Sequence, residues 1–397
     1  MQTGLYIGWT GYGNLGDEAM LEVCRTRFAR FNWITFDSWD ARPKPYDFAR
    51  RAVRSPTVLF ESLRDEIRTG RRVRGFLNGL NGGVDAWGSQ PEALLGGGTL
   101  INANDEFLEQ YRRAHDRLQK PVPVFGCGVK TPDFFAGKGA WRDRTREWVE
   151  LTRDLPVIGV RGPLSKQALD AAGAHNVCIS GDPAVWFHQP LPTTVKVHTA
   201  RPLRIGVNCG SAKFIWGDLS RLVTVQAEVV RKLLARGYEV EIFAICPEDM
   251  AACEEVARQA NAGVSPIPEA LSSHYSYASR LAELDLVITL KLHAAVLAAC
   301  ANVPFIMLEY QPKCRDFCAS IGWEDYNVRT DNADSNTIMS LAERLLHDLP
   351  ASRRLLCVRM CELRASFESY CRHLEQILPA AIPMYPSSEP TTRPGAQ

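Results

Sequence analysis

The sequence predicts an α/β protein built from two successive doubly wound domains, and three observations lead to this prediction. Short, unbroken apolar runs recur along the 397 residues, as expected of strands buried on both faces of a parallel sheet. Amphipathic segments such as Leu222–Ala235 separate the runs and supply the crossover helices. Between His188 and Pro202 a Pro- and Thr-containing stretch precedes a fresh apolar run, which is typical of a linker. We therefore expect Rossmann-like domains at residues 1–190 and 203–378.

The expected strands fall into two groups, one for each domain. The first group is Leu5–Thr10, Trp33–Phe36, Ala93–Leu95, Val122–Phe125, Val157–Val160 and Val177–Ser180. The second group is Leu203–Asn208, Tyr238–Ile245, Leu286–Leu290, Phe305–Leu308 and the weaker run Tyr326–Val328. Two helices, Asn336–Leu346 and Ser352–Leu378, are expected to close the second domain. Residues 379–397 are rich in Pro, Ser and Thr, and we expect a flexible tail there because they have little apolar surface to bury.

The composition excludes several classes of protein. Lys and Arg number 46 and Asp and Glu number 45, so the net charge is +1 and nucleic acid is not an expected partner. No apolar run approaches the roughly 18 residues of a membrane span. The N-terminus lacks the basic segment and long apolar run of a leader. We therefore expect a cytoplasmic protein.

The 12 cysteines are spread along the chain without a Cys-x-x-Cys motif, which is typical of reduced thiols. Two pairs, Cys314/Cys318 and Cys357/Cys361, have one-turn helical spacing. A zinc site would need two more ligands near either pair, and the sequence places none there. No metal is expected.

The strongest local signal is the glycine-rich turn Gly11–Ala19, which follows the first expected strand. Its glycines let the backbone turn tightly and let a ligand approach the start of the next helix. The spacing matches the dinucleotide motif Gly-x-Gly-x-x-Gly, but Asp17 and Glu18 place negative charge where a pyrophosphate would lie. Carboxylates suit sugar hydroxyls better, so Gly13 and Asn14 become candidate acceptor-binding residues. A simple helix-capping turn is the alternative.

Two further glycine-bearing turns, Gly96–Thr99 and Gly126–Gly128, also follow expected strands. Because ligands bind at the carboxyl ends of the strands in doubly wound sheets, the three turns together indicate a shared crevice. Gly97 and Gly98 are candidate acceptor-binding residues in it. Asp182 follows the next strand at the same edge, and it is either another acceptor ligand or a turn residue.

Cationic residues follow other strands. Arg161 lies between an expected strand and a helix opened by Pro163, where it could clamp a carboxylate or phosphate or form a structural ion pair. Lys291 and His293 begin an apolar helix, although the helix dipole disfavours cations at that end. Lys313 follows the next strand. Together these side chains predict an anion on this side of the crevice.

A basic stretch between Arg50 and Arg74 carries repeated arginines interleaved with apolar residues. One interpretation is the solvated face of long helices. The other is peripheral contact with an anionic membrane surface, where a lipid-linked acceptor would be found.

Taken in order, these motifs resemble the polysaccharide pyruvyl transferase family. The matching pieces are Gly11–Leu21, Leu95–Leu100, Val160–Ser165, Gly181–Ala184, Leu290–Ala294 and Tyr310–Lys313. They run through most of the chain in the family's order. The resemblance implies two Rossmann-like domains in a glycosyltransferase-B-like arrangement. It also implies transfer of the pyruvyl group of phosphoenolpyruvate onto two hydroxyls of a sugar, in a polysaccharide or a lipid-linked precursor, to give a cyclic ketal without a further cofactor.

That reaction suggests a role for each candidate residue. Because the donor carries a phosphate and a carboxylate, its site needs cations. The candidate donor-binding residues are Arg161, Lys291, Leu292 and Lys313. His293, which titrates near neutrality, is the candidate general acid for the methylene carbon, or alternatively a phosphate ligand. Asp17, Glu18 or the leaving phosphate could be the general base.

One position departs from the family pattern. The family usually has Arg-Leu-His where this chain has Lys291, Leu292 and His293. A lysine keeps the charge but loses the bidentate fork that matches a carboxylate or phosphate. Weaker donor binding or a different donor would follow.

Other functions remain open from the sequence. A nucleotide-sugar glycosyltransferase of the same fold could use Lys291 and His293 for its diphosphate. A non-catalytic saccharide-binding protein is compatible with the departure at Lys291. A nicotinamide-dependent oxidoreductase is suggested only by Gly11–Gly16, and Asp17 with Glu18 argues against it.

Overall fold

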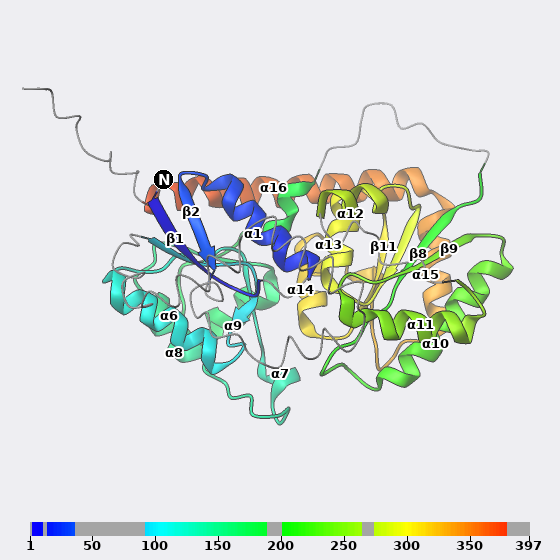
Figure 1. Cartoon of the computed structure of the whole chain (residues 1–397), viewed down its shortest axis with the longest axis horizontal. Helices are drawn as coiled ribbons and strands as arrows, with labels where there is room; N and C mark the ends of the chain where they lie inside the picture. The colour runs from blue at the N-terminus through cyan, green and yellow to red at the C-terminus, as the bar shows by residue number, and fades with distance from the viewer. Residues whose placement is uncertain (1, 11–13, 36–91, 189–200, 264–273, 379–397) are drawn as a thin grey trace, which may run out of the picture.

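The computed structural model describes residues 2–10, 14–35, 92–188, 201–263 and 274–378, which form two lobes side by side (Figure 1). We call the described residues between 2 and 188 the N-terminal lobe and the described residues between 201 and 348 the C-terminal lobe. Four sequence predictions lie outside the described residues: the basic stretch at 50–74, the linker residues 189–200, the tail at 379–397 and Gly13.

The N-terminal lobe contains only parallel strand pairs among its described strands. The strands are β1 (Gln2–Ile7), β2 (Phe31–Thr35), β3 (Glu92–Leu95), β4 (Gly98–Ile101), β5 (Cys127–Val129), β6 (Ile158–Val160) and β7 (Val177–Ile179). They form a sheet of order β2-β1-β3 and a sheet of order β4-β5-β6-β7. Leu95 joins the two sheets, because its N–H donates to Pro123 O at 2.9 Å and its carbonyl accepts from Phe125 N–H at 2.8 Å.

Helices connect these strands. They are α1 (Leu15–Arg27), α6 (Asp105–Leu118), α7 (Pro132–Phe135), α8 (Thr145–Thr152), α9 (Pro163–Ala171) and the 3-10 helix η1 (Pro183–Phe187). The buried faces of α6 and α8 meet where Tyr111 and Trp148 pack with their rings 5.2 Å apart.

Three predictions in this lobe are wrong in detail. The first strand is Gln2–Ile7 and not Leu5–Thr10. Val122–Phe125 forms only one bridge, from Val124 to Leu95, and the strand itself begins at Cys127. Gly126 has φ +64°, a conformation that interrupts an extended run. Gly96–Thr99 was expected to be a loop, but β4 already begins at Gly98.

The C-terminal lobe has one parallel sheet of order β12-β11-β10-β8-β9. Its strands are β8 (Arg204–Asn208), β9 (Glu239–Phe243), β10 (Leu286–Thr289), β11 (Phe305–Glu309) and β12 (Asn327–Arg329). The order reverses between β8 and β10, and this is where doubly wound sheets bind ligands. All five expected strands are present, so the α/β prediction for this lobe is confirmed.

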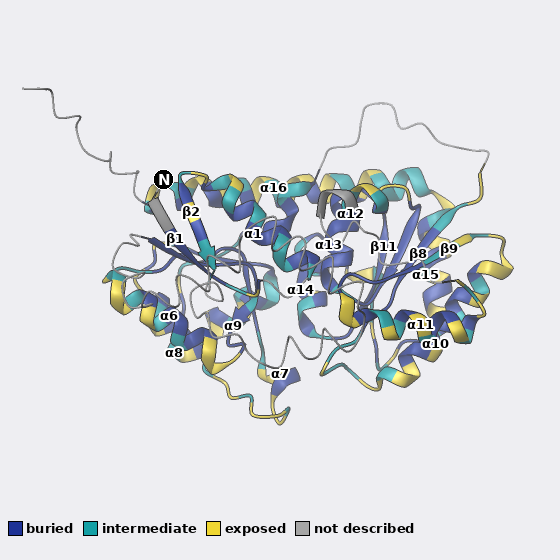
Figure 2. Ribbon diagram, viewed as in Figure 1, coloured by how far each residue is buried: buried dark blue, intermediate teal, exposed yellow. Residues whose placement is uncertain are grey.

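The sheet is covered by helices on both faces (Figure 1). They are α10 (Leu219–Ala235), α11 (Met250–Ala260), α12 (His274–Leu281), α13 (Leu292–Cys300), α14 (Pro312–Ser320), α15 (Ser335–His347) and the 3-10 helices η2 (Pro247–Asp249) and η4 (Glu324–Tyr326). Every residue of α13 is buried (Figure 2), which explains why its sequence is apolar all round. It contacts η1 and α1 of the N-terminal lobe as well as its own sheet.

The last helix, α16 (Leu349–Ile377), runs along both lobes (Figure 1). Its second half packs on the N-terminal lobe, where the Phe367 and Phe125 rings are 5.4 Å apart and Tyr370 Oη donates to Val124 O. Arg27 of α1 pairs with Glu375 at 3.1 Å. None of the described helices combines the length and the apolarity needed to cross a membrane.

Candidate active site between the two lobes

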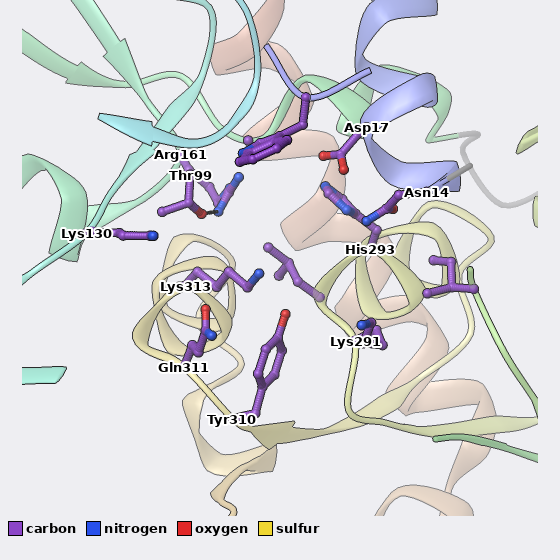
Figure 3. A pocket seen from close by; sticks show the side chains of 14 residues that line it. Asn14, Asp17, Thr99, Lys130, Arg161, Lys291, His293, Tyr310, Gln311 and Lys313 are labelled. Carbon is purple, nitrogen blue, oxygen red and sulfur yellow. Dashed lines mark hydrogen bonds between the residues drawn. The ribbon is translucent and has the colours of Figure 1, made fainter. Parts of the chain in front are cut away.

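A cavity of about 290 Å³ opens between the carboxyl ends of the two sets of strands (Figure 3). Its size is near the lower end of the range for small-molecule pockets. The lining residues are Trp9, Asn14, Asp17, Gly98, Thr99, Lys130, Arg161, Ile245, Lys291, Leu292, His293, Tyr310, Gln311 and Lys313. Both lobes therefore contribute to one site, as the sequence motifs indicated.

The start of α1 forms the acidic side of the cavity. Asn14 caps the helix by accepting a hydrogen bond from Gly16 N–H at 3.0 Å, and this places Asp17 in the first turn. Burial raises the pKa of Asp17, while the charges of His293 and Lys313 oppose the rise. Asp17 is therefore a carboxyl group that can hold a proton more readily than an exposed one.

Gly16 allows the two lobes to touch at the site. A Cβ at this position would lie 1.9 Å from the His293 ring, so only glycine fits. His293 lies in the first turn of α13 and is 9% exposed. Its Nε2 is buried, has no hydrogen-bond partner among the described residues and lies 3.7 Å from Asp182 Oδ2.

Asp182 is fully buried behind His293 and links it to Arg161. Its carboxylate accepts hydrogen bonds from Arg161 Nε and from Ala184 N–H, each at 3.0 Å. Burial opposes ionisation, but Arg161 and His293 outweigh it and lower the pKa of Asp182 to about 2. Asp182 does not line the cavity, so it is placed to orient its neighbours rather than to contact a ligand directly.

Arg161 is held rigidly on the N-terminal side of the cavity. It is 1% exposed, and Nη1 donates to Thr99 Oγ1 at 2.9 Å while Nε donates to Asp182. Gly128 gives it room, because a Cβ there would meet Nη1 at 2.9 Å. The position after β6 thus fixes a guanidinium whose remaining donors are available to an anion.

Lys313 points into the cavity from the first turn of α14 (Figure 3). Within the described part of the chain its ammonium makes no hydrogen bond or ion pair, and it lies 4.9 Å from the centre of the Tyr310 ring. Burial, together with the nearby charges of Lys291 and Arg161, lowers its pKa to about 8. It is a cation that would gain from an anionic ligand.

Lys291 differs from Lys313 because its charge is already compensated. Its Nζ lies 2.9 Å from Asp249 Oδ1 and donates to Ser211 O at 2.9 Å. Burial would lower the pKa of Lys291, but Asp249 raises it above the ordinary value. Asn208, at the end of β8, holds the Lys291 backbone by accepting its N–H at 3.0 Å.

The other predicted site residues have mixed placements. Leu292, Asn14 and Gly98 line the cavity, whereas Glu18 and Gly97 do not. Gly97 instead leaves room for Met20 and Pro183, which a Cβ would meet at 2.4 and 2.9 Å.

Sequence reasoning missed Lys130 and Trp9 as lining residues. Lys130 directly follows β5, and its Nζ donates to Ala103 O at 3.0 Å. Burial, helped by the charge of Lys213, lowers the pKa of Lys130. The sequence could have indicated Lys130, because it follows the glycine-bearing turn Gly126–Gly128 by two residues.

Comparison with solved structures defines the class of the fold. The chain is similar to a putative UDP-N-acetylglucosamine 2-epimerase from Listeria monocytogenes, with TM-score 0.54 and 13% identity over 94% of this chain and 98% of that one. It is similar to S. aureus MnaA in complex with UDP, with TM-score 0.56 and 11% identity over 95% and 97% of the two chains. Anabaena Alr3699/HepE, solved with UDP and glucose, gives TM-score 0.54 and 10% identity over 95% and 99%. The predicted glycosyltransferase-B-like α/β fold is confirmed.

A comparison of the sequence with protein families identifies the family of this chain. Residues 14–312 match the family described as polysaccharide pyruvyl transferase. The chain belongs to that family, as its ordered motifs indicated. Among curated proteins, no significant match to this chain was found.

Proposed function

We propose that this protein transfers the pyruvyl group of phosphoenolpyruvate to two hydroxyls of a saccharide, forming a cyclic ketal and releasing phosphate. One observation carries the proposal: a small cavity is lined by cations from both lobes, by the half-buried carboxyl group of Asp17 and by the imidazole of His293. Family membership supplies the class of reaction. The acceptor would be a sugar within a polysaccharide or a lipid-linked precursor.

The donor would occupy the cationic side. Arg161 offers its remaining N–H donors in a fixed plane, which suits a carboxylate or a phosphate. Lys313 points into the same cavity (Figure 3), and its ammonium makes no hydrogen bond or ion pair with the residues that the structure describes. A bound trianion would raise the pKa of Lys313 from about 8 and keep it protonated at neutral pH.

The saccharide would approach from the side of α1. Asp17 would accept the proton of the first hydroxyl as the oxygen bonds to C2 of the donor, while the imidazole of His293 gives a proton to the methylene carbon C3. The C2–O bond to phosphate then breaks, phosphate leaves with the electron pair, and the second hydroxyl oxygen bonds to C2. Of the two hydroxyl protons, one restores the proton that His293 gave up, and the other leaves with phosphate.

Asp182 would support this step without touching substrate. It remains ionised because Arg161 lowers its pKa, so a negative charge lies 3.7 Å from His293 Nε2 and helps to orient the ring.

The test combines ligand binding with product analysis. Phosphoenolpyruvate should raise the melting temperature of the purified protein, whereas UDP-sugars should not. With a panel of saccharide acceptors, phosphate release should depend on the acceptor and should accompany the mass gain of a pyruvyl ketal.

The variant Lys313→Met should bind the donor much more weakly, and Lys166→Met is its matched control because Lys166 is a lysine on α9 that is paired with Asp170 outside the cavity. Stabilisation by UDP-sugars alone would instead indicate a nucleotide-sugar glycosyltransferase. Saccharide binding without phosphate release would indicate a saccharide-binding protein.

A further inference from the structure

A second cluster of reactive side chains lies outside the cavity, where the N-terminal lobe ends. His188 directly follows η1, and Cys357 and Cys361 lie one turn apart on α16. Their side chains face one another, with His188 Nε2 3.4 Å from Cys361 Sγ and 4.0 Å from Cys357 Sγ. All three candidate ligand atoms lie within 4.8 Å of one another. None of the three residues lines the cavity between the lobes.

These distances match what a tetrahedral zinc ion requires. With Zn–S near 2.3 Å and Zn–N near 2.0–2.1 Å, a tetrahedral angle separates sulfur and nitrogen by about 3.6 Å. The two observed S···N distances, 3.4 and 4.0 Å, lie on either side of that value. Small side-chain rotations would therefore complete the geometry without moving the backbone.

The imidazole is already in the tautomer that a metal needs. His188 Nδ1 lies 3.3 Å from the carbonyl oxygen of Cys300, the last residue of α13. Because a carbonyl oxygen can only accept, this contact places the proton on Nδ1 and leaves the lone pair of Nε2 facing the two sulfurs. Histidine ligands in metal sites commonly donate their other ring N–H to a backbone carbonyl in this way.

The cluster can be reached from solvent at one of its three ligands. His188 is buried and Cys357 is half-buried, but Cys361 is exposed, so an ion can enter from that side.

We propose that His188, Cys357 and Cys361 bind one zinc ion through Nε2 and the two sulfurs, with water as the fourth ligand. Binding would release the two thiol protons, because the ligands are thiolates. The sequence left the Cys357/Cys361 pair without further ligands, and the fold supplies the third in His188.

Such an ion would have a structural role. It would tie the end of η1 to α16, and His188 is in turn held to the end of α13. Asp182 lies at the start of η1 and His293 at the start of α13, whereas His188 and Cys300 lie at the ends of these two helices. The ion would therefore stabilise the packing of η1 against α13, on which the distance between His293 and Asp182 depends.

The test uses metal-free, reduced full-length protein and does not depend on pyruvyl transfer. One equivalent of Co²⁺ should give the d–d bands of tetrahedral cobalt together with thiolate-to-cobalt charge transfer, and Zn²⁺ should displace it. Zinc at a hundredfold excess over Kd should raise Tm by about 3 °C. The variant Cys361→Ser should bind zinc at least about 100-fold more weakly, because removal of supporting residues alone costs up to that much.

Cys178→Ser is the matched control, since Cys178 is a half-buried thiol on β7 outside the cluster, and it should bind as the wild type does. The proposal is overturned if reduced wild-type protein shows no thiolate-to-cobalt band. Equal zinc affinity in Cys361→Ser and Cys178→Ser would overturn it too. So would a Cys357–Cys361 disulfide, detected by mass, that persists under the reducing conditions of the assay.

Discussion

Each lobe places a cation against a buried aspartate beside the cavity, but the two cations keep different numbers of N–H donors for a ligand. Arg161 is buried and Lys291 is half-buried. Arg161 uses Nε on Asp182 and Nη1 on Thr99, and the other guanidinium N–H groups remain for a ligand. Lys291 divides its three N–H donors between Asp249 and Ser211 O, which leaves one.

The carboxylates of Asp182 and Asp249 also differ in how many of their oxygens accept hydrogen bonds. Asp182 is engaged on both oxygens, by Arg161 and by Ala184 N–H, and His293 lies beside it. Asp249 accepts from Ser211 N–H and Lys291 through Oδ1, while its Oδ2 has no partner within the described residues. In the Arg161–Asp182 pair, both carboxylate oxygens are bonded and the cation still has N–H donors for a ligand. In the Lys291–Asp249 pair, one carboxylate oxygen has no partner among the described residues and the cation has a single N–H left. The shape of the cation, and not its charge alone, decides what a buried ion pair can still bind.

The largest expected effect concerns His293, whose imidazole lies beside the Arg161–Asp182 pair. His293→Gln should lower turnover by about 10²–10⁴-fold, because it removes the proton donor that Asp182 supports, with the Kd for phosphoenolpyruvate nearly unchanged. Phosphate-release kinetics and calorimetry would measure the two quantities. His347→Gln, at an exposed position on α15, is the control and should behave as the wild type. Loss of donor binding without loss of turnover at saturation would instead assign His293 to the phosphate.

The second prediction compares the aspartates directly. Asp182→Asn should lower the free energy of unfolding by about 3–5 kcal/mol, because it leaves the nearly inaccessible and permanently charged Arg161 unpaired. Asp249→Asn should cost less, about 1–2 kcal/mol, because Lys291 retains Ser211 O and can lose its proton. Urea unfolding of both variants at neutral pH would measure the difference, and equal losses would contradict the contrast between the pairs.

The third prediction separates Lys313 from both pairs by pH. A lysine with pKa about 8 is protonated below that pH and neutral above it, so donor affinity should fall as the pH rises through 8, approaching tenfold per unit. Titration calorimetry between pH 7 and 9.5 would show the slope. Lys313→Met should bind weakly with a flat profile over this range; a wild-type profile equally flat would exclude Lys313 from the donor site.

The smallest expected effect concerns the pair of Lys291 and Asp249, in which Asp249 Oδ2 has no partner among the described residues. In Lys291→Arg, a guanidinium fork could contact both oxygens of Asp249 and still present an N–H to the cavity. We expect phosphoenolpyruvate to bind a few-fold more tightly, up to about tenfold. An unchanged or higher Kd would mean that phosphoenolpyruvate does not contact residue 291.

Much of the fold was predictable because local pattern and tertiary burial agree. The continuous apolar runs of β8, β10 and β11 identify central strands, and the glycine turn before α1 identifies a ligand-facing edge. The sequence could also place Arg161 and Lys313 after strands, since carboxyl ends of parallel strands share one edge.

Other features depend on partners that no local pattern records. The pairing of Lys291 with Asp249 arises because η2 follows β9, the neighbour of β8, and Asp249 stands in no recognisable motif. Likewise, the spacing of Cys357 and Cys361 predicts a shared helical face but not that His188 lies against it. Val122–Phe125 was misassigned because its apolar composition is that of a strand, while Gly126 shifts the pairing to Cys127.

The path of α16 has a consequence for how the chain is made. The N-terminal lobe is synthesised before α16, yet Phe125 and Val124 of that lobe are covered by Phe367 and Tyr370 of α16. Part of its apolar surface therefore stays uncovered until α16 has left the ribosome. Chaperone contact during synthesis should concentrate on this lobe, and a nonsense codon within α16 should abolish soluble protein rather than yield a stable N-terminal fragment.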